Sequence, residues 1–390
     1  MSAPHFLARW AVLGIVAFLC APWLLPSNKL YHQILIFLLW LPALISLVYG
    51  QLRPRLPRLD LLLYGGLAGW TLVVLVMVGG NDPVSEAKVI LYVSLTLIGI
   101  LLVDRVLPQV LERVLVLAVL VAGVGALSSW IEFYALADHS YGRRLIALGL
   151  WDTIIMAAHA VGALGVIGAG LSISPLQNRQ SLLFIGIATA ACLLFLLFSQ
   201  TRGVWLGLLG VLALVLIGVP WRIRIVAILA FVAAIAAVIW YDAYLLLQRG
   251  LSYRPELWRA GANLVMGNPL LGLGFHDFHL AVPGLKRLFK HPHNLFLDTS
   301  IRLGLIGLLS FSALWVRCAF LAWQARGEAL GRSVLMLWTF STLSLMTDGI
   351  GLWLKPNADW MVTWLPISLG LVLAQRARAS ITSKQPIPGG

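Results

Sequence analysis

The chain has 390 residues, of which 60% are hydrophobic and only 11% charged, and its net charge is +13. Its mean hydropathy of +0.92 lies far above the range of soluble globular proteins. No polar stretch is long enough for a separate soluble domain. The composition therefore indicates an all-α polytopic membrane protein, with residues 1–390 as one integral membrane domain. The positive charge fits membrane lipid head groups or an anionic substrate, and nucleic acid is not an expected partner.

Apolar runs of roughly 17–25 residues, long enough to cross a bilayer as a helix, recur along the chain. The first run ends in "PWLLPSNK" rather than in a small-residue cleavage site, so it is interpreted as a span and not as a signal peptide. About twelve transmembrane helices are predicted, near residues 9–25, 30–50, 59–80, 86–103, 110–135, 152–174, 181–199, 203–220, 223–243, 294–316, 331–350 and 358–376.

Lys and Arg residues are distributed unequally between the two sides that these spans define. With the N-terminus inside, 15 of the 28 lie on the inner side and seven on the outer side apart from the one long loop, residues 244–293. Because Lys and Arg accumulate in cytoplasmic connections, both termini are expected in the cytoplasm. The long loop, between spans nine and ten, then faces outward.

The long loop contains one clear helix signal, "RPELWRAGANLVMG". Pro255 stands in its first turn beside Glu256, and Gly267 ends the pattern with Pro269 just beyond. The spacing of its apolar residues predicts a short helix along the membrane interface. The following "GNPLLGLG" predicts a tight, glycine-rich turn.

Polar groups gather where this loop meets the next span, in "KHPHNLFLDTSIRLGLIG". If a helix begins at His293 and Asn294, then Asn294, Asp298 and Arg302 lie on one face, which must point to protein or water. The positive end of that helix favours a neutral imidazole at His293, as a general base requires. The alternative is that His291 and His293 only cap the helix and touch head groups.

Arginines supply the other candidate groups on the outer side. Arg202 lies in the very short connection "SQTRGVW", and Arg254 lies at the mouth of the interfacial helix. The paired Arg143 and Arg144 in "SYGRRL" can contact phosphate. For each of them, contact with lipid head groups is the alternative. The sequence has no nucleotide-binding glycine motif and no zinc motif, so neither nucleotide, metal nor another cofactor is expected.

Taken together, these segments resemble the O-antigen ligase and polymerase superfamily of membrane glycosyltransferases. The elements "SQTRGVWLGL", "RPELW", "NPLLGLG", "HPHNLFLD" and "RLGLIGLL" follow one another in order over residues 199–310. The resemblance implies an enzyme that transfers polysaccharide from undecaprenyl diphosphate to the lipid A-core oligosaccharide, in lipopolysaccharide biosynthesis. The site would lie at the periplasmic face of the inner membrane of a Gram-negative bacterium.

The resemblance also implies residue roles. Arg202 and Arg254 would hold the diphosphate, and His293 would take the proton of the acceptor hydroxyl in an inverting displacement that needs neither ATP nor metal. From their position on the same helix, and not from the resemblance, Asp298 and Arg302 are interpreted as residues that orient the histidine, while the role of His291 stays open. The single dominant outer loop favours a ligase over the related O-antigen polymerases and protein O-oligosaccharyltransferases. A lipid-linked sugar flippase or transporter is the alternative from another class, and the position of the polar groups at the outer lip favours an enzyme.

Overall fold

A computed structural model describes residues 2–172, 179–218, 220–222, 224–225, 229 and 253–384. Almost all regular structure in these residues is helical, in the order α1 (Ala3–Cys20), α2 (Asn28–Leu35), α3 (Leu41–Ser46), α4 (Arg58–Met77), α5 (Pro83–Val106), α6 (Val110–Trp130), α7 (Ile154–Ser172), α8 (Arg179–Ser199), α9 (Arg202–Ile217), α11 (Arg254–Gly267), α12 (Leu295–Gln324), α13 (Ala329–Asp348) and α14 (Trp360–Lys384). Short π-helical turns follow α2 (Ile36–Trp40) and α6 (Ile131–Leu136).

Nine helical segments within the described residues are long and apolar enough to cross a membrane. The 16-residue α9 and the 25-residue α14 coincide with two further predicted spans. The predicted span at 223–243 lies largely outside the described residues, as does the first part of the long loop, 244–252. The protein is thus an all-α, multi-pass membrane protein, as its composition predicts.

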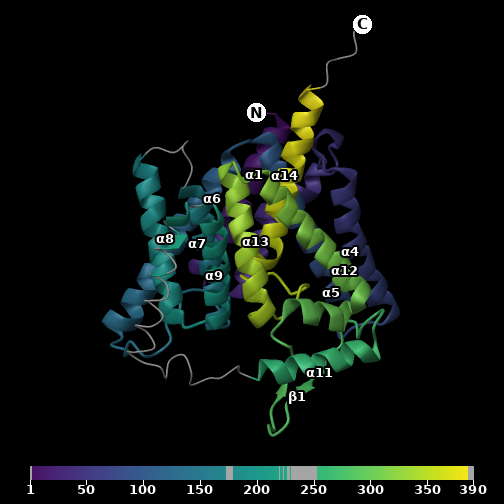
Figure 1. Ribbon diagram of the computed structural model, residues 1–390. Helices are drawn as coiled ribbons and strands as arrows, with labels where there is room; N and C mark the ends of the chain where they lie inside the picture. Colours follow the sequence, from purple (N-terminus) through teal and green to yellow (C-terminus); the bar gives the residue numbers. More distant parts are fainter. Residues whose placement is uncertain are drawn as a thin grey trace.

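Helix α13 occupies the middle of the bundle and packs against α7, α9, α12 and α14. In Figure 1, α6, α7, α8 and α9 lie to one side of it and α4, α5 and α12 to the other. The start of α1 and the end of α14 lie at the top of this view, and α11 lies across the opposite end. The C-terminus of α13, at Asp348, therefore points towards the end of the molecule that carries α11.

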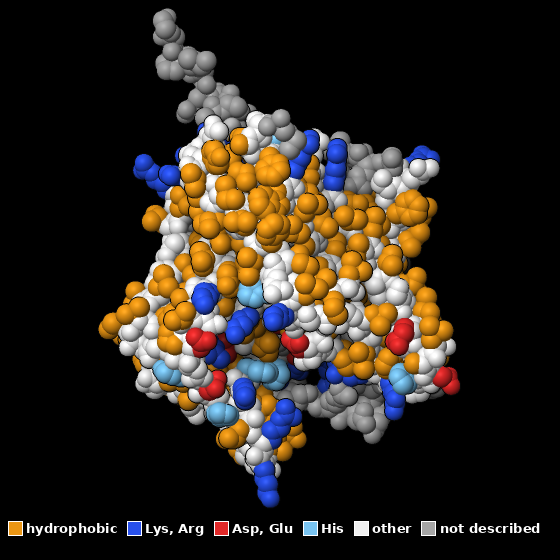
Figure 2. Space-filling model, turned by 180° about the vertical axis from the view of Figure 1, so that it is seen from behind, with side chains coloured by type: hydrophobic (Ala, Val, Ile, Leu, Met, Phe, Trp, Pro, Cys, Tyr) orange, Lys and Arg blue, Asp and Glu red, His pale blue; other side chains and the backbone are white. Residues whose placement is uncertain are grey.

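The surface divides into zones along the same axis. On the face shown in Figure 2, a broad hydrophobic band lies below a rim of Lys and Arg side chains. Most of the Asp, Glu and His side chains on this face gather in the lower half, together with further Lys and Arg. An apolar band between two charged zones is the pattern expected of a bilayer-spanning bundle.

Helix α11 has the bounds that the sequence predicts for the interfacial helix, starting at Arg254 and ending at Gly267. A small antiparallel hairpin, β1 (Leu280–Ala281) and β2 (Leu288–Phe289), follows it and was not predicted. Strands of two residues are too short to produce an alternating pattern in the sequence. A small apolar core anchors this region to α12, and its buried members are Leu257, Phe278, Leu280, Val282 and Ile301.

Helix α12 differs from the continuous span predicted at 294–316, because it is broken at Gly304. The backbone there has φ 67° and ψ −176°, which is not helical. Residues other than glycine rarely adopt this conformation. A Cβ atom at this position would lie 1.9 Å from the carbonyl oxygen of Leu270. The break therefore accommodates the close approach of another segment, the glycine-rich turn at residues 268–274.

This turn replaces the backbone hydrogen bonds that the break removes. The amides of Leu273 and Gly274 donate to carbonyl oxygens at the end of the first half of α12, at 2.7 and 3.0 Å, and the amide that opens the second half donates to Pro269 at 2.8 Å. The indole of Trp70 on α4 donates to Leu303 at 2.8 Å. The predicted tight turn is thus present, and it also fixes the first nine residues of α12 against the outer loop.

Candidate active site

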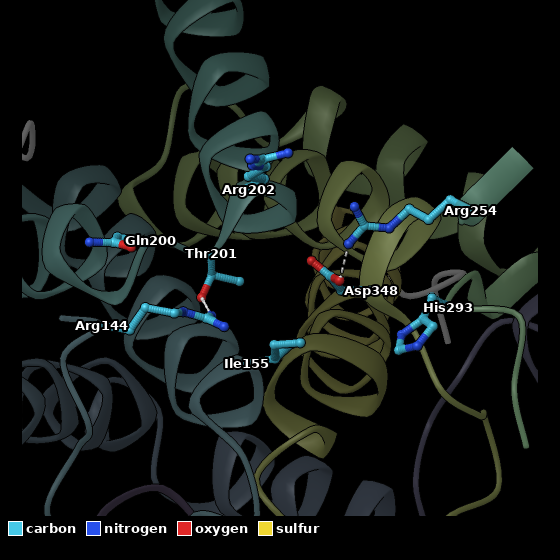
Figure 3. A pocket seen from close by; sticks show the side chains of 8 residues that line it. All are labelled: Arg144, Ile155, Gln200, Thr201, Arg202, Arg254, His293 and Asp348. Carbon is cyan, nitrogen blue, oxygen red and sulfur yellow. Dashed lines mark hydrogen bonds and ion pairs between the residues drawn. The ribbon is translucent and has the colours of Figure 1, made fainter. Parts of the chain in front are cut away.

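A cavity of about 190 Å³ opens at the end of the bundle that carries α11 (Figure 3). Four of the residues selected from the sequence, Arg144, Arg202, Arg254 and His293, share its wall although they are far apart in the chain. The complete lining consists of Arg144, Ile155, Gln200, Thr201, Arg202, Arg254, His293 and Asp348. Most of these side chains are polar or charged, so the cavity suits a polar or ionic ligand.

Three helices begin at this cavity. Arg202 is the first residue of α9, Arg254 is the first residue of α11, and His293 lies two residues before the start of α12. The N-terminus of a helix carries a partial positive charge and unpaired backbone amides, both of which attract anions. The arginines and the helix ends therefore add to the same positive potential.

Arg254 is fixed to the C-terminus of α13 by two short contacts. Its Nε donates to the carbonyl oxygen of Thr347 at 2.7 Å, and its Nη2 donates to the carboxylate of Asp348 at 2.5 Å. Asp348 is almost completely buried. A carboxylate in that position holds the planar guanidinium in one orientation at the cavity wall, as Figure 3 shows.

The glycine of "TRGVW", Gly203, lies where the end of α13 approaches the start of α9 closely. A Cβ atom at this position would lie 2.0 Å from Oδ2 of Asp348 and 2.5 Å from Oγ1 of Thr347. Only glycine lets the end of α13 come this close to the start of α9. Asp348 thus lies between the helix that begins with Arg202 and the guanidinium of Arg254.

The sequence reasoning missed Asp348. Its signal was a single acidic residue at the outer end of an apolar run, in "LSLMTDGIG". A buried carboxylate in a membrane helix needs a cationic partner, and that rule alone would have marked the residue as a candidate.

The adjacent arginines of "SYGRRL" have different surroundings. Arg144 lines the cavity, where its Nε donates to the Ser199 carbonyl at 2.9 Å and its Nη2 to the Thr201 hydroxyl at 3.1 Å. Arg143 is exposed and lies 3.4 Å from Nδ1 of His139, outside the lining of this cavity. Of the two, only Arg144 can contribute to binding there.

His293 adopts an uncommon backbone conformation with φ 54°. Histidine tolerates this left-handed region better than most residues, and the preceding Pro292 restricts His291 to extended conformations. The two histidine rings consequently pack edge to face, with centroids 4.3 Å apart. Both Nδ1 atoms are buried and have no hydrogen-bond partner among the described residues. The packing of His291 therefore orients the ring of His293.

Both histidines are electrostatically disposed to stay neutral. Burial lowers the pKa of His293, and nearby Arg254 lowers it further, while the charge of Asp348 acts in the opposite direction. Burial, together with the charges of His293 and Arg302, lowers the pKa of His291 to about 4. A neutral imidazole at His293 is predicted from the sequence on the basis of the helix end; in the structure the larger cause is burial.

Comparisons with known proteins relate the chain to O-antigen ligases. Residues 187–312 match the sequence model of a family described as O-antigen ligase. The chain is also 26% identical, over 389 residues, to an O-antigen ligase of Pseudomonas aeruginosa, and the alignment covers 96% of this chain and 94% of that protein. The chain is thus similar to O-antigen ligases, over residues 187–312 by the family model and over nearly its whole length by this relative. The matched family region contains Arg202, Arg254 and His293, whereas Arg144 and Asp348 lie outside it.

The other polar residues of the region lie at the start of α12, beside the cavity residues. Asn294 caps α12, because its side chain accepts a hydrogen bond from the amide of Leu297 at 3.0 Å. One turn further, the buried Asp298 pairs with Arg302 at 3.1 Å. The predicted polar face of α12 is therefore present, but Arg302 lines a second cavity and not the one that contains His293.

Within the part of the chain that the structure describes, no group of three or more His, Cys, Asp or Glu side chains is placed to hold a metal ion.

Proposed function

We propose that the protein is an O-antigen ligase that transfers a polysaccharide from undecaprenyl diphosphate to the lipid A-core oligosaccharide. The observation that carries the proposal is the convergence of Arg144, Arg202, Arg254 and His293 on one cavity at the start of three helices. The name of the Pseudomonas aeruginosa relative supports the same reaction.

The charge of the cavity matches the diphosphate of such a donor. Three arginines and one carboxylate, Asp348, line it, which leaves a net charge of +2 when His293 is neutral. A diphosphate esterified at both ends carries one negative charge on each phosphorus. Arginine forks pair with phosphate oxygens in bidentate fashion, and the helix N-termini provide additional amide donors.

His293 is the proposed catalytic base. The acceptor hydroxyl loses its proton to the neutral imidazole while its oxygen attacks the anomeric carbon of the donor sugar. The bond between that carbon and the diphosphate oxygen breaks, and the configuration at the carbon inverts. The arginines stabilise the negative charge that develops on the departing lipid diphosphate. No other reactant is needed to balance the reaction.

The proposed location is the periplasmic face of the inner membrane. The start of α1 and the end of α14 lie at the opposite end of the molecule from α11 (Figure 1). Arg254, the first residue of α11, lines the cavity, and the distribution of Lys and Arg favours a cytoplasmic position for the termini. The cavity would then open beside the outer leaflet, where a lipid-linked donor and a lipid-linked acceptor can both approach by lateral diffusion.

Reconstitution tests this proposal. Purified protein in vesicles is supplied with carrier-linked glycan and lipid A-core, without nucleotide and with a chelator. We expect wild-type protein to form the ligated product and His293→Ala to be slower by about 10²–10⁴-fold, the usual contribution of a general base. His279→Ala, at an exposed histidine of the same loop, is the control. Equal rates for His293→Ala and wild type would refute the role of His293, and product formed only on another acceptor would refute the ligase assignment.

A further inference from the structure

A second cavity, of about 260 Å³, lies near the first and has a different character. It is lined by polar side chains from four separate segments of the chain, together with an aromatic wall. The groups that matter here are Asn81, Glu86, Asp277, Arg302, Trp353 and Lys355. None of them belongs to the arginine cavity, and sequence reasoning selected only Arg302.

The histidine pair connects the two cavities. His293 lines the arginine cavity, and His291 packs against it with ring centroids 4.3 Å apart. The charge of Arg302, which lines the second cavity, acts on His291. The loop after α13 makes a second connection, because Asp348 lines the first cavity and Gly351, three residues later, lines the second.

The charges of the second cavity balance. Arg302 and Lys355 face Glu86 and Asp277, so the lining is neutral overall, in contrast to the net +2 of the arginine cavity. A neutral cavity has no electrostatic preference for an anion. It does offer many hydrogen-bond donors and acceptors side by side, as a ligand that carries several hydroxyl groups requires.

Two lining groups have buried polar atoms without partners among the described residues, Oε2 of Glu86 and Nε1 of Trp353. Buried polar atoms in proteins are normally hydrogen-bonded, so each such exception needs an explanation. A ligand with hydroxyl groups can donate to the carboxylate and accept from the indole. The flat, largely apolar ring of Trp353 also provides a surface for the C–H face of a sugar.

The walls of this cavity are held rigidly. Arg302 is paired with the buried Asp298 at 3.1 Å and lies over the ring of Phe278 at 5.0 Å. Trp353 packs against the buried Trp364, with ring centroids 4.7 Å apart. The break in α12 and the turn docked on it fix the helical segment that carries Arg302. A binding site on such elements is preorganised and costs little entropy when its ligand binds.

We infer that the second cavity binds the terminal sugar of the acceptor oligosaccharide, with Trp353 against a face of the sugar ring and Glu86 and Arg302 bonded to its hydroxyls. This inference rests on the proposed function. In an inverting displacement, the acceptor oxygen approaches from the side opposite the departing diphosphate, with the base next to that oxygen. The acceptor therefore belongs beside the histidine pair, and the second cavity adjoins the pair through Arg302, whose charge acts on His291.

The experiment has two independent readouts. The first is saturation-transfer NMR of the lipid-free core oligosaccharide with purified protein in nanodiscs, in the absence of donor. The second is the KM for the acceptor and the KM for the donor in the reconstituted reaction. The variants are Glu86→Gln, which keeps the size of the side chain, Trp353→Leu and Lys355→Met. The control is Trp323→Leu, at a half-exposed tryptophan near the opposite end of α12.

We expect the variants to raise the acceptor KM about tenfold or more and to lose the saturation-transfer signal, with the donor KM and the control unchanged. Lys355 is exposed, so Lys355→Met keeps the test valid if Trp353→Leu fails to fold. A raised donor KM with an unchanged acceptor KM would assign the cavity to the donor sugar and overturn the inference, as would no change in either. Oligosaccharide binding by wild type without transfer would refute the proposed function and leave the binding site standing.

Discussion

Replacement of Arg254 by lysine tests whether the geometry of the guanidinium, and not only its charge, serves the reaction. Arg254 binds the end of α13 through Nε and Nη2, at 2.7 Å from the Thr347 carbonyl and 2.5 Å from the Asp348 carboxylate. Lysine keeps the positive charge but has one nitrogen. It cannot pair with Asp348, reach the Thr347 carbonyl and present a fork to a diphosphate at the same time.

The expected magnitude follows from the contacts that are lost. A hydrogen bond that involves a charged group contributes about 1.5–3 kcal/mol, and Arg254→Lys loses at least one such bond along with bidentate phosphate contact. A loss of about 2–3 kcal/mol in transition-state stabilisation corresponds to a fall in kcat/KM of roughly 30- to 160-fold. Part of the loss should appear in kcat, because the diphosphate gains charge as it departs.

The assay is steady-state transfer by protein reconstituted in vesicles, with the donor concentration varied. Arg259→Lys is the matched control, since Arg259 lies on the same helix but is exposed and does not line the cavity. We expect the control to stay within about twofold of wild type, because exposed substitutions remote from a site have small effects. If Arg254→Lys also retained the wild-type rate, the bidentate clamp on the diphosphate would be refuted.

Three further changes test other parts of the structure. Gly304→Ala should destabilise the protein by about 3 kcal/mol or more, because alanine would have to adopt a positive φ and its Cβ would clash with backbone atoms. The melting temperature should therefore fall. Gly65→Ala, in open space on α4, should leave the melting temperature unchanged or higher. Asp348→Asn removes the charge that raises the pKa of His293, so the acid limb of kcat/KM should move to lower pH, and a shift to higher pH would contradict this electrostatic reasoning. The pKa of His291 is lowered from 6.5 to about 4 in the folded protein, so the folded protein binds fewer protons than the unfolded protein in this range. Wild type should therefore lose stability as the pH falls from 6.5 towards 4. His291→Gln should show a smaller fall in melting temperature between pH 7 and pH 5, and equal falls would count against the burial of this ring.

The fold was predictable where it depends on local signals. Apolar length places the spans, and the proline and glycine positions place both ends of α11. The break at Gly304 was not predictable in this way, because "RLGLIG" is an ordinary helical pattern for a membrane span, in which glycine is frequent. The φ of 67° arises only because the turn at residues 268–274 presses its backbone against the helix, and that contact is tertiary.

The site shows the same division. Arg202, Arg254 and His293 stood out because each is a polar group at an exposed helix boundary in a chain with few charges. Asp348 and the lining of the second cavity did not stand out, because their significance comes from a partner. Asp348 is important because it pairs with Arg254 at 2.5 Å. Trp353 is important because its buried Nε1 has no hydrogen-bond partner among the described residues. Residues that pair across about a hundred positions produce no local spacing pattern, so the sequence alone does not indicate that they are partners.

The difference in charge between the two cavities gives the proposed reaction a direction. The arginine cavity, with its net charge of +2, stabilises the diphosphate best when that group has gained charge on departure. The neutral second cavity has no such preference and can hold an acceptor sugar before and after transfer. Between them, His293 stays unprotonated in the resting protein because burial disfavours its charge. It becomes easier to protonate once the departing diphosphate adds negative charge beside it. On this view Asp348 has two effects: it orients Arg254, and its charge opposes the lowering of the His293 pKa by burial.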